Sequence, residues 1–244
     1  LRLPLIPARA STERSSTMYY EPCKTHHGLP HDPFKSCVVP RPIGWISTVD
    51  AQGRDNLAPY SQFQNVTFDP PIVMFSANQT TQGERKDSVR NAEQTGQFVW
   101  NMATYALREA VNISAEELPA GVDEFERAGL EKLESLLVKP KRVKGSPIQF
   151  ECEYLNTVRF PGKPPMGTVD VVFGRVVGIH IDDDYIDGDG LVDVLKMQPI
   201  ARMGYFDYTT VDNKFQMVIP GNSKALLAGL EGSPDKAAQE ALPR

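Results

Sequence analysis

Residues 40–78, PRPIGWISTVDAQGRDNLAPYSQFQNVTFDPPIVMFSAN, predict three consecutive β-strands near the start of the chain. The first strand, at 43–49, is apolar and β-branched, and the Asp-Ala-Gln-Gly sequence at 50–53 has the chemistry of a turn. The second strand, at 57–66, runs back and has a polar centre. An Asp-Pro-Pro sequence then breaks the chain before 72–76, a short apolar run that is typical of a buried strand.

Hydroxyl and amide side chains gather in the middle of the first two predicted strands. Ser47, Thr48, Ser61 and Asn65 all lie there. A purely structural hairpin would place such groups on the face that meets water. Their central position therefore indicates hydrogen bonds to a bound ligand.

A second polar motif, RKDSVRN at 85–91, predicts the start of a helix. The free N–H groups of a helix start, the hydroxyl of Ser88 and the cation of Lys86 would converge on an anion such as a phosphate. A carboxylate repels phosphate, so Asp87 is expected to cap the helix, unless Ser88 does so. The residues alone fit equally well an ordinary capped surface helix in which Arg85 and Lys86 are solvated.

Four motifs in this order, RPIGWIST, NLAPYSQF, FDPP and RKDS, resemble the flavin-reductase-like FMN-binding split β-barrel proteins. The resemblance covers residues 18–220 and extends to bacterial FMN oxidoreductases similar to flavoredoxin. It implies a mainly β fold with peripheral helices, an FMN-binding split β-barrel. It also implies an oxidoreductase of the flavin-reductase type, in which hydride passes from NAD(P)H to bound FMN and on to an acceptor.

Carried over position by position, the resemblance implies where FMN would lie. One side of the flavin would be lined by Arg41, Pro42, Ile43, Ser47 and Thr48. The ring or the ribityl groups would be contacted by Ser61, Gln62, Phe63 and Asn65. The phosphate end would be held by Ser76, Lys86, Asp87 and Ser88. Gln62 and Gln64 depart from the family, whose members often have an aromatic or small residue nearby, so the substrate that stacks over the ring stays open.

The segment PIARMGY at 199–205 resembles a late family segment that returns toward the flavin. Arg202, Tyr205 and Tyr208 can then reach a cofactor edge or a substrate, or they can simply close the barrel. Negative charge that develops at N1 and O2 of a reduced flavin needs a cation or N–H groups nearby. Arg202 is the candidate catalytic residue for this role, together with Arg41, and backbone amides are the alternative.

Two other classes of function stay open at this stage. One is a flavoredoxin-like electron carrier without steady NAD(P)H turnover. The other is a non-catalytic barrel that binds flavin or another ligand, or that serves as an interaction module. A homodimer is expected in each flavin-binding case, because one split barrel leaves a side of the flavin exposed and the apolar helical stretch at 105–136 needs a covering surface.

Composition narrows the class of protein. The 244 residues carry a net charge of −5, which argues against a nucleic-acid-binding surface, and 41% of them are hydrophobic, as in ordinary globular proteins. Cys23, Cys37 and Cys152 are scattered, which favours reduced thiols and a cytoplasmic protein. No apolar run reaches the ~20 residues that span a bilayer.

The two ends of the chain differ from its middle. Residues 1–17 are rich in arginine, serine and threonine. A transit peptide is conceivable there, but an upstream-extended reading frame or a cloning-derived stretch before a fold that starts at Met18 is favoured. Residues 221–244 are expected to form a peripheral tail, helical from about 223 or disordered.

Three histidines and two acidic turns invite a metal, but neither pattern fits one. His26, His27 and His31 lack tetrahedral spacing and have no cysteine or carboxylate pattern to complete a site. The acidic turns at 182–190 fail the EF-hand register, because Asp187 stands where glycine is required. No metal site is therefore predicted.

The remaining elements follow from apolar periodicity and turn residues. Gly96 is expected to end the helix that begins near residue 87. The predicted strands are 98–102, 148–154, where Cys152 lies on the apolar face, and 169–181, where Gly174 and Gly178 indicate bulges. The predicted helices are 106–111 and 123–128, and 191–196 is expected to form a short helix or a turn.

Overall fold

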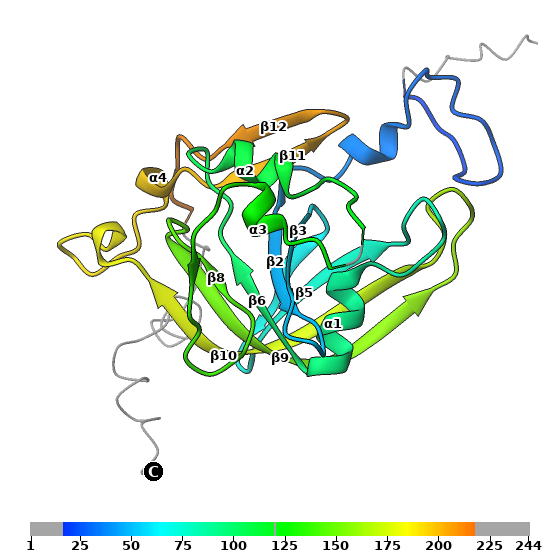
Figure 1. The fold of residues 1–244 in the computed structure, drawn as a ribbon. Helices are drawn as coiled ribbons and strands as arrows, with labels where there is room; N and C mark the ends of the chain where they lie inside the picture. The colour runs from blue at the N-terminus through cyan, green and yellow to red at the C-terminus, as the bar shows by residue number, and fades with distance from the viewer. Residues whose placement is uncertain (1–16, 120, 218–244) are drawn as a thin grey trace, which may run out of the picture.

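A computed structural model describes residues 17–119 and 121–217 (Figure 1). Its main body is a seven-stranded antiparallel sheet with the order β3-β2-β6-β9-β10-β5-β4. The strands are β2 (Gly44–Val49), β3 (Asp55–Tyr60), β4 (Phe63–Phe68), β5 (Pro71–Asn78), β6 (Gln97–Asn101), β9 (Ile148–Phe160) and β10 (Val169–Ile181).

The sheet curls into a split barrel, because β3 and β4 are consecutive in the chain but occupy opposite ends of the strand order. Only Ser61 and Gln62 separate the two strands, so the two edges of the sheet must come together. The approach is close: a Cβ on Gly44 of β2 would lie 2.8 Å from Cδ2 of Phe63 on β4. Glycine is the residue that allows such an approach. The predicted mainly β split-barrel fold is confirmed.

The single strand predicted at 57–66 is wrong. β3 ends at Tyr60 and β4 begins at Phe63, with a bend between them. Both halves have a local β pattern, but closure of the barrel sends them to opposite edges. The other predicted strands are confirmed, and β10 has the predicted bounds, whereas β9 runs on to Phe160.

Smaller elements surround the barrel. A three-stranded sheet has the order β1-β11-β12, and β7 pairs with β8. These strands are β1 (Arg41–Pro42), β7 (Lys132–Leu133), β8 (Arg142–Val143), β11 (Ile200–Gly204) and β12 (Asp207–Thr210). The helices are α1 (Asp87–Thr95), α2 (Arg108–Ile113), α3 (Glu124–Arg127) and α4 (Val194–Met197), with 3-10 turns η1 (Pro33–Ser36) and η2 (Asp183–Tyr185). Gly96 ends α1 with φ 73°, as predicted.

Two apolar clusters form the core. The first lies inside the barrel and includes Phe75 and Cys152, both fully buried. Burial raises the pKa of the Cys152 thiol, and its predicted place on the apolar face is confirmed. The second cluster joins Val111 of α2 and Phe125 of α3 to Trp45 of β2. The barrel itself thus covers part of the apolar helical stretch, and Figure 1 shows α2 and α3 near the β11–β12 end.

The glycines of β10 interrupt its pairing with β9, as predicted. The register shifts between Phe173 and Gly174 and again between Val176 and Gly178. A Cβ on Gly174 would lie 2.3 Å from the ring of Phe98, so this bulge also makes room for a core side chain.

Two predictions about the ends of the chain fall largely outside the described residues. The extension predicted at 1–17 lies outside them except for Thr17, and the tail predicted at 221–244 lies outside them entirely. Within residues 17–119 and 121–217, no helix has the length and apolar character needed to cross a membrane.

Candidate functional site

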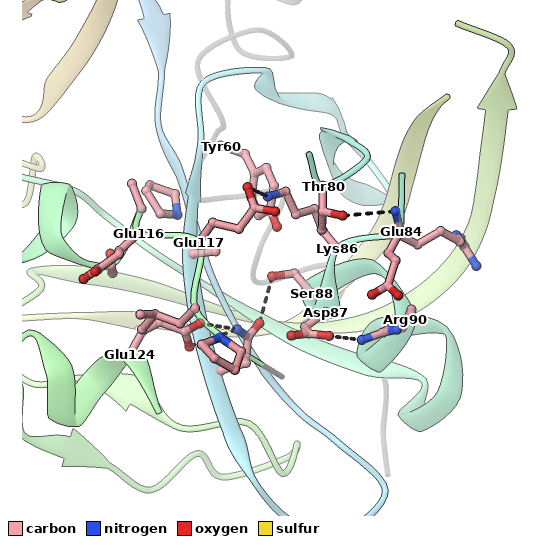
Figure 2. A pocket seen from close by; sticks show the side chains of 18 of the residues that line it. Tyr60, Thr80, Glu84, Lys86, Asp87, Ser88, Arg90, Glu116, Glu117 and Glu124 are labelled. Carbon is pink, nitrogen blue, oxygen red and sulfur yellow. Dashed lines mark hydrogen bonds and ion pairs between the residues drawn. The ribbon is translucent and has the colours of Figure 1, made fainter. Parts of the chain in front are cut away.

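A cavity of about 410 Å³ lies between β3, the loop before α1 and the segment at 114–119. This volume is within the range of ligand pockets, roughly 300–1,000 Å³. Asn56 and Tyr60 line it from β3, and residues 84–88 line it from the start of α1. Figure 2 shows Lys86 and Glu117 reaching toward each other near Tyr60. The cavity is therefore bordered by charged groups from segments far apart in the sequence.

The start of α1 presents hydrogen-bond donors to this cavity. Lys86 is the N-cap residue, with φ −60° and ψ 144°, and its side chain makes no capping hydrogen bond to this end of the helix. The first N–H groups of a helix have no acceptor within the helix, and its dipole favours an anion there. The prediction that Asp87 or Ser88 caps α1 is wrong, because both are already helical and their side chains bond to Arg90 and Asn56.

Arg85 is a structural anchor. Its guanidinium donates to the two carboxylate oxygens of Glu93 at 2.6 and 2.7 Å and to Asp170 Oδ2 at 2.8 Å. Asp170 is buried on β10 and also accepts from Arg159 at 2.7 Å. The bonds to Glu93, followed by those to Asp170, raise the pKa of Arg85 against the effect of burial. The loop before α1 is thereby tied to β10.

Lys86 is the cation of the cavity with the loosest pairing. Of the three cations that line it, Arg85 is held by two carboxylates and Arg90 is bonded to Asp87. Lys86 Nζ lies 3.8 Å from Glu117 Oε2, which is an ion pair beyond hydrogen-bond distance. An anion that enters the cavity thus finds the least competition at Lys86.

A buried polar network beneath the cavity holds Ser88. Glu124 accepts from Asn56 Nδ2 at 3.0 and 2.9 Å and from the N–H of Leu57 at 2.9 Å. Asn56 Oδ1 in turn accepts from Ser88 Oγ at 2.9 Å and from Thr48 Oγ1 at 3.1 Å. Burial raises the pKa of Glu124, although the bonds it accepts oppose this. The hydroxyl proton of Ser88 is therefore committed to Asn56.

Several residues that line this site are absent from the sequence-based prediction, among them Asn56, Tyr60, Glu117 and Glu124. Asn56 and Tyr60 belong to the NLAPYSQF motif, so their signal is present in the sequence. The two glutamates come from segments with no local signal. Burial raises the pKa of Tyr60, so its hydroxyl stays protonated and can donate a hydrogen bond.

The structure brings only some of the predicted flavin-binding residues together. Lys86, Asp87 and Ser88 line the cavity. Ser47 and Thr48 are fully buried and bond within the protein, since Ser47 Oγ donates to the carbonyl oxygen of Lys141 at 2.5 Å. Thr48 does not line the cavity, but it donates to Asn56, which does and which also accepts from Ser88.

The other predicted residues lie outside the lining of this cavity, and their contacts with a flavin stay predictions. Ile43 and Phe63 belong to the two apolar clusters, and Ser61 and Gln62 form the bend between β3 and β4. Asn65 is exposed on β4, and Ser76 is half-buried on β5. The three-stranded sheet contains Arg41, Pro42 and Arg202.

Comparison with known proteins identifies the family. The model of the flavin reductase like domain matches residues 36–198, and the chain belongs to the flavin reductase-like family. An uncharacterized protein of Aquifex aeolicus is 38% identical over 167 residues, which are 68% of this chain and 82% of that protein. The predicted resemblance is confirmed.

Solved structures agree with this assignment. Nitrilotriacetate monooxygenase component B from Bacillus cereus is 28% identical, with a TM-score of 0.75 over 83% of this chain and 99% of that one. Flavoredoxin of Desulfovibrio vulgaris (Miyazaki F) is 17% identical, with a TM-score of 0.64 over 75% of this chain and 93% of that one, and shares the fold.

The cofactor implied by the family fits the donors of this cavity. FMN ends in a phosphate, and a phosphate needs N–H groups and a cation. The start of α1 has no side-chain cap and Lys86 is loosely paired, so both can serve an anion. The donors of this cavity therefore fit the phosphate of FMN.

Proposed function

We propose that the protein is an FMN-dependent oxidoreductase that accepts hydride from NADH or NADPH and passes the electrons to a flavin or another small acceptor. The single observation that carries this proposal is the position of Lys86 beside the uncapped start of α1, in the cavity of a flavin reductase-like barrel. The match of residues 36–198 to the flavin reductase like domain supports a reductase over a carrier.

The chain's own residues bind and orient the cofactor in this proposal. Lys86 and the first N–H groups of α1 hold the phosphate, while the Asn56–Glu124 network fixes the orientation of Ser88. Tyr60 contributes a protonated hydroxyl to the same wall. FMN itself supplies the hydride-accepting ring when bound, so the protein has to provide position and electrostatics. Arg202 and Arg41 are proposed to offset the negative charge that develops on the reduced ring.

The proposal includes a homodimer, supported by an apolar strip on the outer face of the sheet. Val158 of β9 is paired with Val171 of β10, and Phe160 is paired with Val169. Successive side chains of a strand point to opposite faces of the sheet. Val172, which directly follows Val171 in β10, is buried in the core, so these four side chains face outward. Phe160 is 54% exposed, and a second copy of the chain would cover it. A monomeric mass by light scattering at micromolar concentration would contradict the dimer.

The proposed location is the cytoplasm. Cys23, Cys37 and Cys152 are all free thiols in the structure. Unpaired cysteines suit a compartment that keeps thiols reduced.

An anaerobic titration of the purified protein tests the proposed function. The preparation is expected to show flavin absorbance bands, and NADH or NADPH is expected to bleach them. Steady oxidation of the same nicotinamide should follow when free FMN or riboflavin is added as acceptor. If the flavin bands are present but neither NADH nor NADPH bleaches them, the result would favour the electron-carrier function instead. A protein that binds no FMN would contradict the proposal altogether.

A further inference from the structure

Glu117 occupies the point where the donors around Lys86 converge. Its Oε1 accepts from the N–H of Thr81 at 3.1 Å and from Thr81 Oγ1 at 3.4 Å, and its Oε2 lies 3.8 Å from Lys86 Nζ. Figure 2 shows this carboxylate and the Lys86 ammonium meeting inside the cavity. An N–H, an O–H and an ammonium on one side of an anion are the same donors that a phosphate uses.

The donor Thr81 is held in place without Glu117. Thr81 lies in a turn in which the N–H of Thr80 donates to Glu84 O at 2.7 Å and the N–H of Gly83 donates to Thr80 O at 2.9 Å. Thr80 Oγ1 also accepts from the N–H of Glu84 at 3.0 Å. Gly83 has φ +84°, which glycine adopts readily. The N–H of Thr81 would therefore keep its direction if Glu117 turned away.

The segment that carries Glu117 is also anchored independently. Ser114 is buried, accepts from Trp45 Nε1 at 2.9 Å and donates to Val111 O at 2.9 Å. The neighbouring Glu116 pairs with Arg127 at 3.0 Å. The side chain of Glu117 is 36% exposed, so it can rotate into solvent while the backbone of 114–119 keeps its contacts.

We propose that Glu117 is a specificity-determining residue that competes with the phosphate of the flavin for Lys86 and Thr81. This inference rests on the proposed function, because it concerns the same anion site. Two anions cannot share one set of donors, since like charges repel at this distance. Binding of FMN thus requires Glu117 to leave, and part of the phosphate's binding free energy is lost to that exchange. Riboflavin, which has no phosphate, does not displace Glu117.

The consequence is a flavin that exchanges. A competing carboxylate that belongs to the protein itself lowers the affinity for FMN and narrows the difference in affinity between FMN and riboflavin. Most differences in affinity between related complexes appear in the dissociation rate. Glu117 is expected to raise the FMN dissociation rate in this way.

Titration of the full chain with FMN and with riboflavin, followed by flavin fluorescence, tests the proposal with Glu117→Gln. This variant keeps the shape of the side chain and removes its charge. The dissociation constant for FMN is expected to fall about three- to five-fold, since exposed ion pairs are worth up to ~1 kcal/mol and each tenfold step is ~1.4 kcal/mol. The dissociation constant for riboflavin is expected to stay unchanged.

Glu116→Gln is the matched control. It removes an equal charge from the adjacent residue, which also lines the cavity but pairs with Arg127. Its effect on FMN is expected to be within about two-fold. Unchanged or weaker FMN binding in Glu117→Gln would overturn the proposal, as would equal tightening of FMN and riboflavin or equal tightening in the Glu116→Gln control.

A second measurement separates this inference from the proposed function. Inorganic phosphate that binds the folded state raises the unfolding temperature, and the shift grows with affinity. Glu117→Gln is expected to show a larger phosphate-dependent shift than the wild-type protein. If the wild-type protein binds no flavin, the proposed function fails, and the phosphate shift still decides whether Glu117 competes for an anion. An equal shift in both proteins would overturn the competition.

Discussion

Arg41 on β1 and Arg202 on β11 are register partners, so two cations stand side by side in the three-stranded sheet. Arg41 donates to the carbonyl oxygens of Lys35 and Val38 at 2.7 and 2.9 Å, and Arg202 donates to Tyr208 Oη at 2.6 Å. The acceptors are uncharged oxygen atoms, so these hydrogen bonds do not neutralise the positive charge of the two guanidinium groups. This pair is thus suited to an anionic ligand or to negative charge that develops during a reaction.

Arg202→Ala is expected to slow flavin reduction or to raise the KM for the nicotinamide, while the folded protein keeps its flavin. The reason is that a cation near developing negative charge acts more strongly in the transition state than in the ground state. Stopped-flow reduction under anaerobic conditions measures both quantities. Arg108→Ala, which removes a cation stacked on Tyr105, is the control. An unchanged rate with unchanged nicotinamide dependence would make Arg202 a purely structural residue.

Lys86→Ala is expected to weaken FMN about ten- to a hundred-fold, because a charge-assisted contact is worth ~1.5–3 kcal/mol. Riboflavin has no phosphate and should bind as before. Fluorescence titration with both flavins measures the two effects, and Lys144→Ala, whose side chain pairs with Glu131 on the surface, is the control. Equal losses for FMN and riboflavin would show that Lys86 does not contact the phosphate.

Asp170→Asn is expected to lower the free energy of unfolding near neutral pH by about 3 kcal/mol, because it breaks a buried ion pair. Burial pulls the pKa of Asp170 upward, but the bonds from Arg159 and Arg85 outweigh this and leave it below the ordinary value of 3.8. A depressed folded-state pKa adds stability above the unfolded-state pKa, and that stability is lost as the pH falls through the folded-state value.

The difference between wild type and Asp170→Asn should therefore stay constant from about pH 7 to about pH 5 and shrink as the pH falls below about 4. Urea unfolding at several pH values measures it. Glu153→Gln, which loses an exposed pair with Arg175, should change the free energy of unfolding by less than ~1 kcal/mol. A difference that stays constant with pH would mean that the Asp170 carboxylate does not stabilise the fold through its charge.

Gly174→Ala is expected to destabilise the barrel by about 1–3 kcal/mol, because its methyl group would overlap the ring of Phe98 in a packed core. Thermal unfolding checks this against Gly188→Ala, where a Cβ meets nothing within 4 Å. Equal unfolding temperatures for the two variants would mean that Phe98 has room to move aside.

The sequence predicts much of this fold because local patterns and tertiary structure agree in most places. The strand at 169–181 is a β-branched run between turn residues, and the structure has it with the same bounds. The prediction fails at 57–66, where the break between β3 and β4 comes from closure of the sheet and leaves no mark on local propensity.

The candidate site was predictable only in part for a similar reason. The RKDS motif places Lys86, Asp87 and Ser88 at the cavity because a helix start is a local feature. Glu124 reaches Asn56 across 68 residues, and no spacing rule reveals such a contact. The polar centres of the strands were also ambiguous, since the hydroxyl of Ser47 already donates to a carbonyl oxygen of the protein.

The strand order has a consequence for synthesis on the ribosome. β5 ends at Asn78, yet its second neighbour β10 is complete only at Ile181, about a hundred residues later. At roughly 5–20 residues per second, the nascent chain spends on the order of 5–20 s with one side of β5 unpaired. An unpaired apolar strand edge is a site of aggregation. The emerging N-terminal half is thus expected to need a chaperone until the second long strand leaves the exit tunnel.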